Sequence, residues 1–376
     1  MKVKIDSRIF AIFFFILIET MYGFELTFIR IPNDIYTVLL YASVFCFLCA
    51  ISMTKWTVSE ATRAICMLVI ALAVYISSKE SLYFLLMFAG IIMHCINYKD
   101  ALITIFITRL FILFWIILLS LFNVIPINEM SVSKGVSGFA VGYGLGFIHP
   151  NDLAQAIFIL CIIYLCIRRN KIDIKDKILF FLVTVINYSI TKSRTIFIIS
   201  IFILFMLIIN NFNLGNKMLI YSAIPIYIVA VLISLVIPYL YNESTGILRN
   251  IAFIANGILS GRFSNASMLF QNFPVTLFGK IVNTDILQSI YGYDVIDNGY
   301  VFLLFNYGII GSLTILILYF YVIKKLIKRK EIVYLIMVLA FLLLGTMENV
   351  IRSVAVNFTM IFWYEFIRDS KNNIGL

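Results

Sequence analysis

Long apolar runs separated by short polar connections fill the chain from residue 9 to residue 367. Each run approaches the roughly 20 apolar residues that a helix needs to cross a bilayer. The pattern predicts an all-α, polytopic membrane protein with about 12 transmembrane helices, at Ile9–Ile29, Ile35–Thr54, Ala64–Ser78, Ser81–Asn97, Ala101–Ile125, Pro150–Ile167, Lys177–Thr191, Thr195–Asn210, Met218–Pro238, Asn298–Ile323, Ile332–Met347 and Ser353–Ile367.

One connection is much longer than the rest. Tyr239–Asp297 contains Asn, Gly and Ser turn signals around short apolar pieces, which predict short helices that lie on the membrane surface. The chain therefore divides into residues 1–238 with spans one to nine, residues 239–297 as a large extracytoplasmic loop, and residues 298–376 with the last three spans and a cytoplasmic tail.

Composition and charge agree with this interpretation. Hydrophobic residues make up 62% of the chain and charged residues 13%, about half the charged fraction of a soluble domain. With the N-terminus inside, the inner connections carry 19 basic residues and the outer ones nine. By the positive-inside rule both termini are cytoplasmic. The net charge of +10 then reflects topology and attraction to anionic lipid heads, and it is no evidence for nucleic-acid binding.

The stretch Gly142–Asp152 is glycine-rich and ends in a His-Pro-Asn turn between two apolar runs. Pro150 biases His149 towards an extended conformation and suits the first turn of a helix, where Asn151 lies near the positive end of the dipole. A flexible loop that places a titratable ring at a helix start indicates a functional site. The alternative is a connector whose histidine only caps the helix.

Two further groups of polar residues share the predicted outer side. Lys192 and Arg194 interrupt an otherwise apolar sequence, which favours a phosphate clamp over the alternative of lipid head-group anchoring. Glu348 and Arg352 are four residues apart in a tight connection. They would form an ion pair if that connection is helical, or Glu348 would act as a general base towards a sugar hydroxyl.

Three more positions hold charged residues that the pattern of apolar spans does not explain. Arg262 follows a glycine in the long loop, where the backbone can approach a ligand. Asp297 opens the tenth span, where helix capping alone explains it. Arg109 lies within a span at a cost of about 2.5–3.5 kcal/mol, so it is expected to pair with Glu19 or Glu25.

The order of these motifs resembles the bacterial O-antigen and capsular polysaccharide polymerase family (Wzy-type), within the superfamily that also contains the O-antigen ligases. The span count and the large loop before the last spans also match, so the resemblance covers most of the chain. The matching pieces are Gly146–Asn151, Thr191–Thr195, Leu259–Arg262, Asp297–Tyr300 and Tyr307–Gly311.

The resemblance implies a C-type glycosyltransferase fold that works without a metal or cofactor. A growing glycan on undecaprenyl diphosphate would be transferred onto a new lipid-linked repeat unit at the outer face of a bacterial cytoplasmic membrane. A chain-length regulator and a flippase are possible partners. The expected catalytic residues are His149 and Glu348. The expected substrate-binding residues are Asn151, Lys192, Arg194, Arg262, Asp297, Asn298 and Arg352.

Two other functions compete with this one. An O-antigen ligase usually carries a histidine in its large outer loop, and Tyr239–Asp297 has none. A flippase or other transporter is expected to place charged residues deep in several spans, and here only Arg109 and the first-span glutamates lie there.

The charge bias predicts that a cysteine introduced into the loop 239–297 reacts with a membrane-impermeant thiol reagent in intact cells or spheroplasts. A cysteine in the connection after Ile167 is the matched inner control and should react only after lysis. Labelling of the loop cysteine only after lysis would overturn the assigned orientation.

Overall fold

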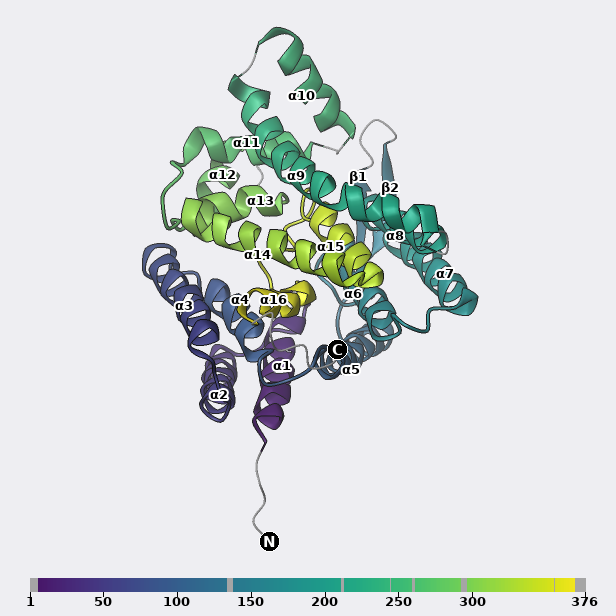
Figure 1. The fold of residues 1–376 in the computed structure, drawn as a ribbon. Coiled ribbons are helices and arrows are strands. Elements are labelled where there is room, and N and C mark those ends of the chain that lie inside the picture. Colours follow the sequence, from purple (N-terminus) through teal and green to yellow (C-terminus); the bar gives the residue numbers. More distant parts are fainter. Residues whose placement is uncertain are drawn as a thin grey trace.

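The structure is a computed structural model that describes residues 6–133, 138–210, 213–243, 245–258, 261–291, 296–354 and 356–368 (Figure 1). These residues are mostly helical, with one two-stranded sheet, which confirms the all-α membrane class. The α-helices are α1 (Ser7–Gly23), α2 (Asn33–Ser52), α3 (Val58–Ser78), α4 (Ser81–Ile92), α5 (Tyr98–Leu121), α6 (Pro150–Ile167), α7 (Ile174–Thr191), α8 (Arg194–Ile209), α9 (Asn213–Glu243), α10 (Gly246–Ile258), α11 (Arg262–Asn272), α12 (Thr284–Tyr291), α13 (Gly299–Phe302), α14 (Gly308–Arg329), α15 (Ile332–Leu344) and α16 (Tyr364–Ile367).

Short elements complete the chain between these helices. A π-helical turn, η2 (Leu303–Tyr307), joins α13 to α14, and a 3₁₀ turn, η3 (Phe358–Trp363), precedes α16. Among the described residues, six helical segments are long and apolar enough to cross a membrane, and four shorter apolar ones accompany them. The number of twelve spans therefore stays a prediction.

Helix α15 forms the centre of the bundle. Its residues are apolar on every face, and nearly all of them are buried, which is the pattern of a helix enclosed by protein rather than lipid. It contacts α6, α8, α9 and α14, and Figure 1 shows it among them. The position of this helix determines where the connection after Leu344 emerges.

The glycine-rich stretch begins in strand β2 of a hairpin and is closely packed, where the sequence predicted a flexible loop. Strand β1 (Glu129–Ser133) pairs antiparallel with β2 (Phe139–Tyr143). A Cβ atom on Gly142 would lie 2.5 Å from the carbonyl oxygen of Thr191. Gly146 has a φ of +90° and would place a Cβ 2.7 Å from Ile125. These glycines therefore permit close packing and a left-handed backbone instead of supplying mobility.

The first helix ends earlier than predicted, at Gly23 instead of Ile29. The residues after it pair with the glycine-rich stretch: the Phe28 N–H donates to the Gly146 carbonyl (3.1 Å) and the Ile148 N–H donates to the Leu26 carbonyl (3.0 Å). Long-range backbone pairing satisfies the amides that a continued helix would have satisfied locally.

The long loop contains the short helices that its sequence predicted. Helix α11 packs against α9, and Figure 1 shows α10, α11 and α12 gathered at one end of the molecule. Leu259 and Ser260 lie outside the described residues. The second half of the loop is held by close backbone contact, because a Cβ on Gly279 would lie 2.0 Å from the Asn306 carbonyl oxygen.

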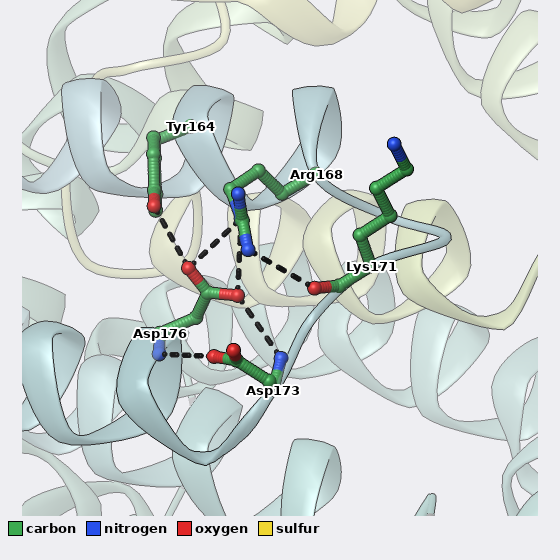
Figure 2. Close-up of polar contacts among 5 residues, drawn as sticks. All are labelled: Tyr164, Arg168, Lys171, Asp173 and Asp176. Carbon is green, nitrogen blue, oxygen red and sulfur yellow. Dashed lines mark hydrogen bonds and ion pairs between the residues drawn. The ribbon is translucent and has the colours of Figure 1, made fainter.

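A network of hydrogen bonds and one ion pair stabilises the turn between α6 and α7 (Figure 2). The Asp176 carboxylate accepts from the Tyr164 hydroxyl at 2.8 Å and from the Arg168 guanidinium at 3.0 Å. Asp173 and Asp176 cap each other's backbone N–H groups, both at 3.0 Å. This polar network lies at the end of α6 opposite His149 and stabilises the antiparallel packing of α6 and α7.

The mid-span Arg109 has Glu19 as its partner, as expected. The guanidinium is bidentate, with Nε at 2.6 Å and Nη2 at 3.1 Å from the two carboxylate oxygens. The exposed fraction of the side chain is 10% for Arg109 and 1% for Glu19. The pair ties α5 to α1, since each charge lacks water and depends on the other.

Removal of either charge alone should therefore destabilise the protein. Arg109→Leu leaves Glu19 buried without its partner, with an expected cost of about 3–5 kcal/mol. The melting temperature of the purified protein in detergent measures this loss. The double variant Arg109→Leu with Glu19→Leu should recover most of it. A double variant no more stable than the single one would contradict the pairing argument.

Candidate functional site

A buried ion pair joins the long loop to the end of the central helix. Glu348 follows α15, and its carboxylate Oε1 accepts from Nη2 of Arg262 at 2.7 Å. The exposed fractions of the two side chains are 6% for Glu348 and 14% for Arg262. The amide of Gln155, from the second turn of α6, donates to the other carboxylate oxygen at 3.3 Å. Three distant parts of the sequence thus meet at Glu348.

Two more carboxylates lie near the Glu348–Arg262 ion pair. Asp152, in the first turn of α6, and Asp297, before α13, lie close enough for their charges to act on Glu348. Burial raises the pKa of the Glu348 carboxyl; the charge and hydrogen bond of Arg262 oppose this effect, and the charge of Asp297 adds to it. A carboxyl with a raised pKa in a polar pocket suits proton transfer.

Arg352 does not pair with Glu348, contrary to the alternative based on their four-residue spacing. The chain between residues 345 and 354 bends and turns without forming a helix, so the i,i+4 geometry is absent. The Arg352 guanidinium lies over the ring of Phe302, 4.8 Å from its centre. Its charge acts on Glu25 and Glu80 instead.

His149 caps α6, as the alternative interpretation of its motif proposed. Its backbone is extended, and its Nδ1 accepts from the Asn151 N–H at 3.0 Å. A ring that accepts at Nδ1 carries its proton on Nε2 when it is neutral. In this arrangement the histidine is a hydrogen-bond donor at Nε2, and the side chain is half-buried.

The Lys192–Arg194 turn lies beside the start of α6. The Asn187 amide, one turn earlier in α7, donates to the Ala154 carbonyl at 3.1 Å. Lys192 ends α7 with a φ of +56°, and Arg194 begins α8 as an exposed side chain. The turn therefore shares the His149 end of the bundle.

Asn298 is a buried helix cap in this structure. Its Oδ1 accepts from the N–H groups of Tyr300 (3.0 Å) and Val301 (3.1 Å), and its amide donates to the Ser234 carbonyl (3.0 Å). The side chain is fully buried. Its part in substrate binding, like that of Asn151, stays a prediction.

Asp152 and Gln155 are members of the cluster that the motif analysis did not select. Both lie on α6, three residues apart, and so share one helix face. Two polar side chains on one face of an otherwise apolar helix are the signal that could have identified them. No such local signal in the sequence identifies the contact between Arg262 of the long loop and Glu348.

A narrow cavity leads from the cluster towards the Glu19–Arg109 pair. Its volume is about 70 Å³, and it lies between α1, α5 and α6, with Asp152 and Gln155 among its lining residues. This space can hold several water molecules. The cavity extends from the polar cluster into the bundle as far as the Glu19–Arg109 pair.

The fold and site define a helical membrane protein with a buried, mixed-charge cluster at one end of its bundle. No family model, curated protein or solved structure matches the chain. The chemistry of the cluster therefore carries the functional argument.

Glu348→Gln should change how stability depends on pH. Because the folded-state pKa of Glu348 is raised, the folded protein binds its proton more tightly, so wild-type stability falls as pH rises towards that pKa. The neutral amide lacks this dependence. The melting temperature of the variant relative to wild type should rise between acid and neutral pH. An opposite trend would show that Arg262 outweighs burial.

Proposed function

We propose that the protein is a polysaccharide polymerase, a membrane glycosyltransferase that transfers a growing undecaprenyl-diphosphate-linked glycan onto a new lipid-linked repeat unit. The observation that carries the proposal is the buried Glu348–Arg262 pair, which places a carboxyl of raised pKa against a guanidinium. These are the base and the phosphate-binding group that glycosyl transfer from a diphosphate requires.

In the proposed reaction, Glu348 takes the proton of an acceptor hydroxyl. The hydroxyl oxygen forms a bond to the anomeric carbon of the donor glycan, and the bond from that carbon to the lipid diphosphate breaks. The diphosphate leaves with the electron pair of the broken bond. Arg262 compensates its growing negative charge, and Lys192 and Arg194 at the same end of the bundle add positive charge.

The pair also provides a means to activate the base. Arg262 opposes the rise in the pKa of Glu348. A donor diphosphate that draws the guanidinium away removes this effect, and the carboxylate becomes a stronger base. Donor binding and base strength are then coupled, so that the carboxylate gains basicity when a donor is present.

His149 would serve as a hydrogen-bond donor in this reaction. Its Nδ1 already accepts from the helix it caps, so the neutral ring offers N–H at Nε2. A donor at that position suits a sugar or phosphate oxygen, while Glu348 takes the proton.

The proposed setting is the outer side of a bacterial cytoplasmic membrane, with both termini inside. The basic residues favour this orientation. The polar network around Asp176, at the other end of α6 from His149, includes a turn that the charge bias assigns to the inner side. The lipid carrier would hold donor and acceptor in the same bilayer. A chain-length regulator and a flippase would act on the same lipid-linked glycans.

Arg262→Ala should lower turnover of purified lipid-linked repeat units at least tenfold, because a charge-assisted contact to phosphate contributes about 1.5–3 kcal/mol. Arg194→Ala should also impair turnover, and Arg194→Lys less so, since it keeps the charge but loses the planar fork. Polymer length and turnover, with and without EDTA, are the measurements. Arg249→Ala removes an exposed arginine from α10 of the same loop and serves as the matched control.

Full activity of both arginine-to-alanine variants at normal protein levels would contradict the diphosphate role and favour lipid head-group anchoring. Deletion in cells separates the other functions. A polymerase deletion leaves single repeat units on the carrier or surface lipid without a polymer ladder. Loss of the single-unit surface product as well would favour a ligase or a flippase.

A further inference from the structure

A second group of polar side chains lies around Arg352, on the other side of the bend that carries Glu348. We name it the Arg352 pocket. Its members come from four separate parts of the chain and combine phenolic hydroxyls, carboxylates and one guanidinium: Tyr22, Glu25, Tyr36, Glu80, Tyr307 and Arg352.

Shared aromatic contacts place three of these residues together. The Tyr307 ring packs edge-on against Phe302, with ring centres 5.8 Å apart, and Arg352 lies over the same Phe302 ring. Tyr307 also packs against Tyr83, at 4.7 Å, and Glu80 directly precedes the helix that carries Tyr83. Tyr307 thus has Arg352 and Glu80 as neighbours.

The other three residues form an adjoining recess of about 380 Å³, and all of them line it. The hydroxyls of Tyr22 and Tyr36 are 2.7 Å apart, and the Glu25 N–H donates to the Tyr22 carbonyl at 3.2 Å. The charge of Glu25 acts on Arg352 and Glu80, which joins the recess to the first three residues.

The Tyr307 hydroxyl is a hydrogen-bonding group beside Arg352 and Glu80 that the described residues leave unused. The side chain is 0% exposed, and among the described residues no atom hydrogen-bonds its hydroxyl. A buried polar group without a partner costs free energy and needs an explanation. Tyr307 ends the π-helical turn η2, and such turns are frequent at functional sites. The hydroxyl also interacts electrostatically with Glu80, Arg352 and Glu25.

The charges of the pocket select the class of ligand. The two carboxylates, of Glu25 and Glu80, are balanced by two guanidiniums, those of Arg352 and of Arg30 in the wall of the recess, so no excess of positive charge selects a diphosphate. Carboxylates accept hydrogen bonds from sugar hydroxyls, phenols and the guanidinium donate to ring and hydroxyl oxygens, and aromatic rings cover apolar sugar faces. The recess is also large enough for one sugar ring, since ligand pockets start at roughly 300 Å³.

We propose that the Arg352 pocket is a sugar-binding subsite that holds the non-reducing end of the acceptor glycan, an inference that rests on the proposed polymerase function. The connection between the two sites supports this assignment. Glu348 and Arg352 lie on one bend, and Tyr22 lines both the recess and the cavity that reaches Asp152 and Gln155. A glycan held here would present its hydroxyl towards Glu348.

The test uses the full-length protein in nanodiscs and the oligosaccharide released by mild acid from the lipid-linked repeat unit of the same cells. Calorimetric titration should show that Tyr307→Phe and Glu80→Gln each bind this oligosaccharide roughly five- to tenfold more weakly than wild type, because the first loses a hydroxyl and the second loses the charge that strengthens the hydrogen bonds of the carboxylate. Tyr334→Phe removes a buried tyrosine hydroxyl beside Arg169 and should bind as wild type does.

Melting temperatures separate binding from folding. Tyr307→Phe deletes a hydroxyl that has no partner among the described residues, so its ligand-free melting temperature should equal or exceed that of wild type. In chain-extension assays the same variant should raise KM for the acceptor and leave kcat almost unchanged. An unchanged KM in both Tyr307→Phe and Glu80→Gln would overturn the subsite.

The two proposals fail in different ways. A wild-type protein that extends chains but shows no oligosaccharide binding, or variants that bind as tightly as wild type, would overturn the Arg352 pocket alone. Oligosaccharide binding that both variants weaken, in a protein that forms no polymer, would support the pocket and overturn the polymerase assignment.

Discussion

The burial of Glu348 at the end of the central helix is the constraint on which the site depends. A carboxylate with 6% exposure loses most of its hydration, and it is retained only if charged and polar groups replace the water. Here Arg262 from the long loop and Gln155 from α6 replace it. The loop must therefore fold back onto the bundle, and α11 is held where its first residue reaches Glu348.

The two buried ion pairs of the bundle differ in a way that fits different roles. Arg109 and Glu19 satisfy each other with two hydrogen bonds inside the bundle, as a structural crosslink does. Arg262 and Glu348 share one such bond, and two more carboxylates act on Glu348. A guanidinium held by one such bond can turn to a phosphate at a lower cost than one held in a closed bidentate pair.

The irregular segment between α15 and η3 connects the proposed chemistry to the proposed sugar subsite. If residues 345–354 were helical, Glu348 and Arg352 would lie on one face and neutralise each other. Because the segment bends, Glu348 meets Arg262 and Arg352 meets Glu25 and Glu80. The bend therefore converts two residues of one short motif into members of two adjacent sites.

Local patterns in the sequence determined the helical membrane class, the short helices of the long loop, the helix start at Pro150 and the pairing of Arg109 with Glu19 or Glu25. The spacing of apolar residues and the position of a proline act over a few residues. The cost of a charge in lipid limits the partners of a buried arginine to the few acidic residues within other spans. Tertiary structure alone decided that the glycine-rich stretch is closely packed, because Gly142 and Gly146 meet side chains and carbonyls from distant parts of the chain. It also decided that Arg262, 86 residues away in sequence, pairs with Glu348. The burial that makes this pair necessary arises only when the helices pack together.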